Sequence, residues 1–370
     1  MDFSLSSEQA AIQKTFHDFA ERELRPVAAT LDERPEFPRQ LFEKIGELGF
    51  FGMRYPEPHG SGADVVSCAL ALEELAWGSL SVAAACTMQS LMGTWFVYRF
   101  GSADHHERLL RPALAGKKIG AICMTEPNAG SDLFSMTTRA SESGGRWQVS
   151  GSKTWVTSAP VADFFTVFAR TGKESLGVFL IERGAPGLEL GRPIEKLGVR
   201  SSLTSEVHFS DVPASALLGD PESGTKYLRE ILAEIRVVTA ALALGIGRAA
   251  YEEAKRYASE RQQFGKPIDR FELVQEHLAE MATDLEAARR LTLWAAWRSD
   301  QKLPNAREAS MAKLFASEAA NRICDRAARV TASYGFAAES PIQRYLRDAR
   351  FVLIGGGTSE ILRVNIARES

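Results

Sequence analysis

Two segments of the chain combine small, polar and aromatic residues in a way that suits ligand binding. The first, 125–132, reads Thr-Glu-Pro-Asn-Ala-Gly-Ser-Asp and follows a predicted strand. Its small residues let backbone N–H groups approach an anion or a planar ligand closely. The second, 261–265, reads Arg-Gln-Gln-Phe-Gly and separates two predicted helices. It could contact a pyrophosphate, although a loop that caps a helix explains these residues equally well.

Trp155 and Thr157 lie in a segment that alternates between polar and apolar residues, as a strand does. The alternation places both side chains on one face, where they offer an aromatic plane and a hydroxyl group. Taken alone, these two residues are explained equally well as a tryptophan in the core of a barrel and a strand-forming threonine.

Other motifs do not add further chemistry. Residues 245–250 fit the pattern G-x-G-x-x-A, but they lie inside a predicted helix, where close helix packing explains them better than dinucleotide binding. The glycines at 355–357 are not followed by the Lys-Ser/Thr pair of a phosphate-binding loop. The histidines lack the spacing of metal ligands and the cysteines form no C-x-x-C pair, so we expect neither a metal site nor a disulfide framework.

Helical and strand periods divide the chain into three parts that would position these segments. From about 6 to 115, apolar residues recur with a helical period. From 119 to 212 the period is two and Gly-rich breaks separate short strands, which favours an antiparallel sandwich or barrel. From 226 onward long helical segments return, which is typical of an antiparallel helix bundle. We place the domains at 1–118, 119–222 and 223–370.

The composition excludes several classes of protein. The chain has 370 residues, with 44 Lys and Arg against 47 Asp and Glu, so it lacks the basic excess of a nucleic-acid binder. The apolar stretch 65–86 is interrupted by Glu73 and Glu74, and the stretch 237–247 is too short to cross a bilayer. The N-terminus has no apolar core of signal-peptide length. We therefore expect a cytoplasmic protein that binds neither nucleic acid nor a membrane.

Together these segments resemble the acyl-CoA dehydrogenase family of flavoproteins over nearly the whole chain. In the N-terminal part the matching motifs are FSLSSEQ (3–9), PEPHGSG (56–62) and EELA (73–76). In the β part they are MTEPNAGSD (124–132), GSKTWVTS (151–158) and KLGVRSS (196–202). In the C-terminal part they are YASERQQFGKPI (257–268), YLRDAR (345–350) and GGGTSEI (355–361).

The resemblance implies a fold, a cofactor and partners. The implied fold has an all-α N-terminal domain, a central β-barrel or sandwich domain and a C-terminal four-helix bundle. FAD would be bound non-covalently, and the assembly would be a homotetramer or a homodimer. The substrate would be an acyl-CoA or carrier-protein thioester, and the electron acceptor an electron-transfer flavoprotein or oxygen.

The resemblance also assigns roles to individual residues. Trp155 would flank the isoalloxazine ring, Thr157 would hydrogen-bond near its N5, and Arg261 and Phe264 match residues that reach the FAD of a neighbouring subunit. Arg236 matches an arginine on the helix beside the active site, and Arg368 a residue that contacts the nucleotide end of CoA. The expected cofactor-binding residues are Ile122, Met124, Thr125, Gly130, Ser131, Trp155, Thr157, Arg261, Phe264, Arg329, Thr358 and Glu360, and Ser131 and Arg368 are the expected substrate contacts.

The catalytic base is the clearest departure from the family. The usual glutamate lies in a Tyr-Glu-Gly-Thr run, which here reads Gly-Gly-Gly-Thr and puts Gly356 at the position of the base. Some branches carry the glutamate on another helix, at the position of Ile235. Glu234 is adjacent, but one residue turns a helical side chain by about 100°, so it would need local distortion to reach the substrate. The backbone N–H of Gly356 can still donate to the thioester oxygen.

A second departure lies between two C-terminal helices. Ala332 and Ser333 stand where the family has Gly-Gly, and Arg329 stands where it usually has Gln. An arginine there could still meet the pyrophosphate of FAD.

We therefore expect an FAD-dependent oxidoreductase that acts on an acyl thioester with a non-standard base. Losing the Tyr and Glu side chains enlarges the pocket and removes a negative charge, which suits a substrate with an α-carboxylate, an α-hydroxyl or an amino-acyl group. General-base catalysis is worth about 10²–10⁴-fold, so ordinary desaturation without a substitute base would be slow. The alternatives are a flavin enzyme of this fold with different chemistry (hydroxylation, decarboxylation or desulfination) and a catalytically inactive thioester-binding protein.

Overall fold

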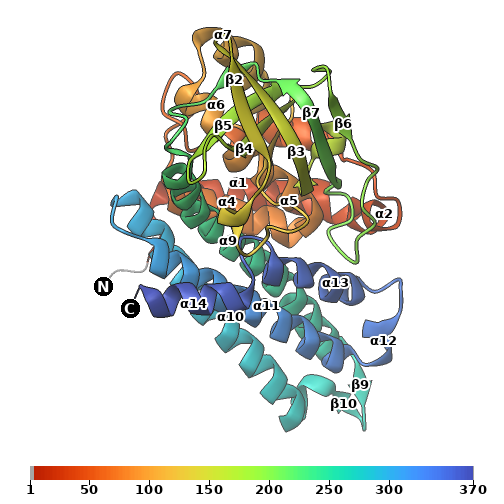
Figure 1. Ribbon diagram of the computed structural model, residues 1–370. Coiled ribbons are helices and arrows are strands. Elements are labelled where there is room, and N and C mark those ends of the chain that lie inside the picture. The colour runs from red at the N-terminus through yellow and green to blue at the C-terminus, as the bar shows by residue number, and fades with distance from the viewer. Residues whose placement is uncertain (1–3, 370) are drawn as a thin grey trace.

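Short helices form the first part of the computed structural model, which describes residues 4–369 (Figure 1). The first helix begins at a capping box, in which the Ser6 side chain accepts a hydrogen bond from the backbone N–H of Gln9 and the Gln9 side chain accepts one from the backbone N–H of Ser6. The helices are α1 (Ser7–Phe19), α2 (Ala28–Glu33), α3 (Arg39–Glu47), α4 (Val65–Gly78), α5 (Leu80–Thr87), α6 (Trp95–Phe100), α7 (Ala103–His105) and α8 (Arg111–Leu114). Every residue of α5 and nearly every residue of α4 is buried, so these two helices form the centre of this part.

One helical segment among the described residues is long and apolar enough to cross a membrane. It runs from Leu80 to Phe100 with a mean hydropathy of 1.3, and 83% of its most apolar stretch of 18 residues is buried inside the protein. Burial of this extent is what a core helix of a folded domain shows.

The second part is a β-sheet domain, built from eight strands. Its strands are β1 (Gly120–Cys123), β2 (Arg139–Ser143), β3 (Arg146–Thr157), β4 (Phe164–Arg170), β5 (Leu176–Glu182), β6 (Leu188–Leu190), β7 (Thr204–Pro213) and β8 (Ala216–Leu217). They follow the order β6-β7-β3-β2-β4-β5-β8, and β1 pairs with β4. The expectation of a purely antiparallel sheet is wrong, because β1 and β2 both run parallel to β4. The period of two does not reveal strand direction, which depends on how the connections run.

The third part is a bundle of long helices. Its elements are α9 (Gly224–Glu260), α10 (Glu272–Asp300), α11 (Ala306–Thr331), α12 (Ser333–Phe336), α13 (Pro341–Ile354) and α14 (Ser359–Arg368). A small hairpin of β9 (Gln262–Gln263) and β10 (Lys266–Pro267) joins α9 to α10 at the end of the bundle far from the sheet (Figure 1). The boundaries proposed at 118/119 and 222/223 fall in connections between elements, and they stay predictions.

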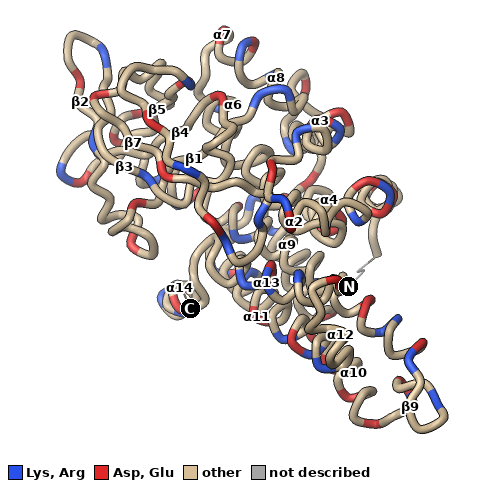
Figure 2. Tube along the Cα trace, turned by 90° about the vertical axis from the view of Figure 1, so that its right-hand side faces the viewer, with Lys and Arg blue, Asp and Glu red and all other residues tan. Residues whose placement is uncertain are grey.

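Helix α9 connects the bundle to the first part because it packs against α4 as well as against α10, α11 and α13. The contact is close: a Cβ atom on Gly245 would lie 2.3 Å from the carbonyl oxygen of Glu73. This close approach explains the G-x-G-x-x-A pattern as helix packing, as predicted from the sequence. Lys and Arg are interspersed with Asp and Glu along all three parts, and no single part is uniformly basic (Figure 2).

Candidate active site

The turn between α13 and α14 brings Gly356 against α9. Gly356 has a φ of 73° and Gly357 one of 108°, conformations that glycine adopts at little cost. A Cβ atom on Gly356 would lie 3.3 Å from Cγ2 of Ile235 and 2.9 Å from Oγ1 of Thr239. The Thr239 hydroxyl donates to the carbonyl of Ile235 and is thereby satisfied. The two positions at which the resemblance places the family's glutamate are thus neighbours, and neither residue here carries a carboxylate.

The backbone of this turn leaves one donor available. Gly355 N–H donates to the carbonyl of Phe351 and Gly357 N–H to that of Ile354, at 2.9 Å and 3.2 Å. Between them, the N–H of Gly356 donates to no acceptor within residues 4–369. It is therefore free to donate to a ligand, as expected for an oxyanion contact.

Lys313 on α11 holds the same turn through hydrogen bonds to its backbone, a contact that the sequence did not indicate. Its ammonium group is fully buried and donates to the carbonyls of Gly357 at 2.6 Å and Leu353 at 3.2 Å. Burial lowers the pKa of Lys313 to about 7. These two bonds fix the backbone on either side of Gly356.

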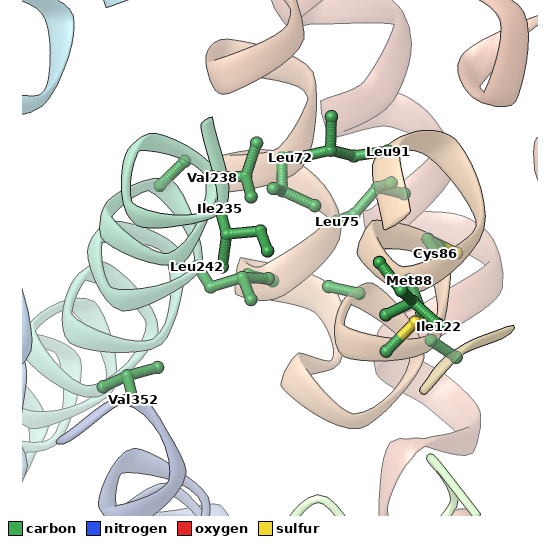
Figure 3. Close-up of a cluster of buried hydrophobic side chains, with 14 of the residues drawn as sticks. Leu72, Leu75, Cys86, Met88, Leu91, Ile122, Ile235, Val238, Leu242 and Val352 are labelled. Atoms are coloured by element: carbon green, nitrogen blue, oxygen red, sulfur yellow. The ribbon is translucent and has the colours of Figure 1, made fainter. Parts of the chain in front are cut away.

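Glu234, which precedes Ile235 on α9, forms an ion pair with Arg54 of the first part. Its Oε2 lies 3.1 Å from Nη2 of Arg54, and that guanidinium stands 5.1 Å from the ring of Trp95. On the neighbouring face of α9, Ile235, Val238 and Leu242 face the leucines of α4 (Figure 3). Glu234 is therefore held in an ion pair one helical position away from Ile235.

Arg236 turns toward the bundle. Its Nη1 donates to the hydroxyl of Ser310 at 3.1 Å, and its buried Nε finds no partner within the described chain. Burial lowers its pKa. The residue thus lies on α9 and is directed at α11.

The loop after β1 is held rigidly to β3. Ile122 lies in β1, the carbonyl of Met124 accepts from the Lys153 ammonium at 2.9 Å, and the carbonyl of Thr125 accepts from the backbone N–H of Thr154 at 2.9 Å. Gly130 and Ser131 follow as exposed residues of the same loop. These contacts anchor the start of the loop to β3.

A buried ion pair completes this support. Lys153 and Glu126 lie 2.9 Å apart, and the Glu126 carboxylate also accepts hydrogen bonds from the backbone N–H groups of Thr137 and Thr138. Burial acts to raise the pKa of Glu126, but the hydrogen bonds and the Lys153 charge outweigh it and lower that pKa to about 2. Both residues lie in the motifs that the sequence singled out, yet no pattern paired them.

Trp155 stands at an irregularity in β3. The pairing of β3 with β7 shifts register between Lys153 and Val156, and Trp155 has a φ of 57°. Such a bulge redirects a side chain, and Trp155 is 58% exposed while Thr154 and Val156 are buried. The interpretation of Trp155 as a barrel-core residue is therefore wrong. Thr157 is half-buried at the end of the same strand.

Three predicted residues lie in the helix bundle, at the β9–β10 hairpin and near the end of α11, and not in the sheet domain that carries this loop (Figure 1). Arg261 ends α9, and Phe264 occupies the tip of the β9–β10 hairpin with 92% of its surface exposed. The segment is thus a hairpin and not only a helix-capping loop. Arg329 pairs with Asp325 of its own helix at 2.7 Å. A single chain does not bring these residues to Trp155.

The remaining predicted residues lie on α14. Thr358 is its N-cap and accepts from the backbone N–H of Ile361, and Glu360 lies in the first turn. Arg368 is exposed in the last turn. Within residues 4–369, no three His, Cys, Asp or Glu side chains are grouped so as to hold a metal ion.

This arrangement fits a flavin. An exposed indole at a strained backbone position stands beside a rigid loop whose small residues allow close approach of a planar ring. A free N–H at Gly356 lies on the turn that faces α9. Flavin-dependent oxidoreductases that act on acyl thioesters combine these same three parts: a helical part, a sheet domain with such a loop, and a helix bundle.

Comparison with known families confirms the class. The chain matches the acyl-CoA dehydrogenase N-terminal domain over 6–117, the middle domain over 121–212 and the C-terminal domain over 222–370. The chain therefore belongs to the acyl-CoA dehydrogenase family. It is an FAD-dependent oxidoreductase, and homotetramers are typical of its family.

Individual relatives cover the whole chain. Benzylmalonyl-CoA dehydrogenase of Aromatoleum aromaticum is 58% identical over 100% of this chain and 99% of its own length. The structure of butyryl-CoA dehydrogenase from Megasphaera elsdenii matches with a TM-score of 0.96 and 34% identity, over 100% of this chain and 99% of that one. The FAD complex of PigA matches with a TM-score of 0.96 and 30% identity over the same shares.

Proposed function

We propose that this protein oxidises an acyl-CoA that carries a carboxylate on its α-carbon, and that loss of carbon dioxide replaces removal of an α-proton. The observation that carries the proposal is that Gly356 and Ile235, the two positions expected for the family's glutamate, lie side by side and neither carries a carboxylate. A malonyl-type acyl group, such as the one in the name of the relative from Aromatoleum aromaticum, has a carboxylate at the carbon where that base would act.

The surroundings of this position favour release of a carboxylate. Ile235 is 4% exposed and presents a methyl group to the Gly356 position. The Thr239 hydroxyl, the nearest atom to that position, already donates to the carbonyl of Ile235. A carboxylate in an apolar setting is poorly solvated, so its conversion to neutral carbon dioxide is favoured. A glutamate at either position would instead repel it.

The chain's own residues hold the thioester. The Gly356 N–H donates to the thioester oxygen and stabilises the negative charge that develops there, while Lys313 keeps the turn in place. The bond from the α-carbon to the carboxylate breaks, its electron pair forms the α,β double bond, and carbon dioxide leaves. FAD supplies, when bound, the acceptor of the hydride that leaves the β-carbon. The products are an enoyl thioester and carbon dioxide.

The predicted binding roles complete the proposal. The loop with Ile122, Met124, Thr125, Gly130 and Ser131 would hold the flavin ring together with Trp155, Thr157, Thr358 and Glu360. Because Arg261, Phe264 and Arg329 lie in the helix bundle, at the hairpin and near the end of α11, they would serve the FAD of another subunit in a homotetramer or homodimer. Arg236 would line the substrate side of α9. Ser131 and Arg368 would contact the CoA part of the substrate, and electron-transfer flavoprotein would accept the electrons in the cytoplasm.

The test compares two thioesters that differ only in the α-carboxylate. Benzylmalonyl-CoA and 3-phenylpropionyl-CoA are mixed separately with the FAD-loaded enzyme without oxygen, and flavin absorbance is followed. The first should reduce the flavin and release carbon dioxide from an isotope-labelled carboxylate, and the second should react at least 100-fold more slowly, as expected without a base.

Three outcomes would overturn the proposal. Equal rates with the two thioesters would indicate an ordinary dehydrogenase with another base. Flavin reduction without release of labelled carbon dioxide would indicate proton removal. Oxygen-dependent product formation without flavin reduction in the anaerobic reaction would indicate different chemistry on the same fold.

A further inference from the structure

A narrow pocket lies beside the reacting position, between α9 and the helices of the first part. Its lining residues are Phe50, Arg54, Val65, Cys68, Leu72, Ser90, Leu91 and Val238. Val238 follows Ile235 by three residues on α9 and precedes Thr239, which touches the Gly356 position. Figure 3 shows Val238 beside Leu72 and Leu91, on the side of α9 that also carries Ile235. The substituent on the β-carbon of an acyl group would therefore extend into this pocket.

The pocket is mostly apolar, and its polar lining residues are Arg54, Cys68 and Ser90. Phe50, Leu72, Leu91 and Val238 are all buried. Burial raises the pKa of the Cys68 thiol to about 12, so this cysteine is neutral. Arg54 thus brings the only formal charge to this lining among the described residues. Its partner Glu234 does not itself line the pocket, and the two side chains keep 17% and 27% of their surface accessible.

This ion pair has unused hydrogen-bonding capacity. Of the five guanidinium donors of Arg54, one donates within the described chain, to Oε2 of Glu234. The other carboxylate oxygen of Glu234 accepts no hydrogen bond from residues 4–369. These atoms can be satisfied by water in the free enzyme or by a polar group of the substrate.

We propose that the Arg54–Glu234 pair selects acyl groups whose distal end forms hydrogen bonds, and rejects alkyl groups of the same length. This inference rests on the proposed function for where the thioester lies. An alkyl tail would strip water from the pair without replacing its hydrogen bonds, whereas a distal hydroxyl would donate to Glu234 and accept from Arg54. Groups that bond to charged partners gain enough to change affinity by about 10- to 100-fold.

The experiment uses alkylmalonyl-CoA thioesters from propyl to hexyl, each paired with its ω-hydroxy derivative. Dissociation constants are measured from the change in the flavin spectrum, and kcat/KM from flavin reduction. At the length that reaches the pair, the wild-type enzyme should prefer the hydroxylated member by about 10- to 100-fold. Equal affinity for both members at every length would overturn the proposal, whether or not any variant folds.

A double variant assigns the preference to this pair. Arg54→Leu with Glu234→Leu removes both charges together and leaves neither unpaired, so it should fold and should reverse the preference toward the alkyl member. The matched control is Arg99→Leu with Glu230→Leu, which removes another ion pair anchored on α9 but absent from this pocket. An unchanged ratio in the Arg54–Glu234 variant, or an equal loss in the control, would refute the assignment.

The result is separable from the proposed function. If the malonyl thioesters bind without reducing the flavin, the proposed reaction fails, while the ratio of dissociation constants still tests the pocket. If they reduce the flavin without any preference between paired members, the reaction stands and the role of the pair is refuted.

Discussion

Replacing Ile235 by glutamate should convert the enzyme into a conventional dehydrogenase. Ile235 is the better of the two positions for this change, because a side chain on Gly356 would need a φ of 73° and would clash with Thr239 at 2.9 Å. Ile235 lies in the regular helix α9 and already presents its side chain to Gly356. A glutamate there would place a carboxylate where the family's base acts.

The magnitudes follow from burial and charge. A general base is worth about 10²–10⁴-fold, so flavin reduction by 3-phenylpropionyl-CoA should rise by that factor. Two like charges about 4 Å apart at an effective dielectric constant of about 20 repel by about 4 kcal/mol, so benzylmalonyl-CoA should lose about 10³-fold in kcat/KM. In the free enzyme, loss of the buried isoleucine and burial of the carboxyl group in its protonated form together cost about 2–5 kcal/mol of folding free energy, which a domain of ordinary stability survives. Both rate effects refer to the ionised form of this group.

The assay is anaerobic flavin reduction with both thioesters by wild type, Ile235→Glu and Ile235→Gln. The glutamine variant matches the size and polarity of the glutamate without its basicity, so it should gain nothing with 3-phenylpropionyl-CoA. FAD content and thermal unfolding establish that each variant is folded and loaded. A folded Ile235→Glu enzyme that gains no activity on the unsubstituted thioester, or an equal gain in Ile235→Gln, would refute the reasoning.

Three further predictions concern the supports of the fold and site. Glu126→Gln should leave the Lys153 ammonium buried without its counter-ion and lower both the free energy of unfolding, by about 3–5 kcal/mol, and the retention of FAD. The double variant Glu126→Leu with Lys153→Met should recover most of the stability. Unfolding curves and bound flavin measure these effects, and a single variant that behaves like the wild type would contradict the role of the pair. Ala332→Gly should raise the free energy of unfolding by about 1 kcal/mol. The backbone of Ala332, with a φ of 50° and a ψ of −129°, strains alanine by about 1–3 kcal/mol, whereas glycine costs about 0.5–1 kcal/mol in conformational entropy. An unchanged or lower melting temperature would show that the strain is absent. Burial raises the pKa of Asp348 from 3.8 to about 6, so the folded state holds this proton more tightly than the unfolded state does, and folding stability falls as the pH rises through that range. The stability gained by Asp348→Asn should therefore grow by about 1 kcal/mol between about pH 5 and pH 8. A difference in denaturant unfolding that stays constant with pH would argue against this reasoning.

Much of the architecture could be predicted from local patterns. Helical periodicity, period-two strands and their order along the chain depend on residues near one another, and they indicated three parts of the correct type. The same local information explained Gly245 as a packing residue, because the pattern lay inside a helical stretch. Strand direction could not be read in this way, since β1 and β2 pair parallel to β4 across long connections.

The candidate site, too, combines features that the sequence alone determined with features that only the tertiary structure decided. The sequence by itself determined which side chains are present: a glycine at 356, an isoleucine at 235 and a tryptophan at 155. Only the tertiary structure decided that Gly356 and Ile235 touch, that a bulge turns Trp155 outward and that Arg54 pairs with Glu234. The reason is physical, because residue type is a local property of the chain, whereas these contacts join segments whose approach is fixed by the packing of α9 against the first part and the turn after α13.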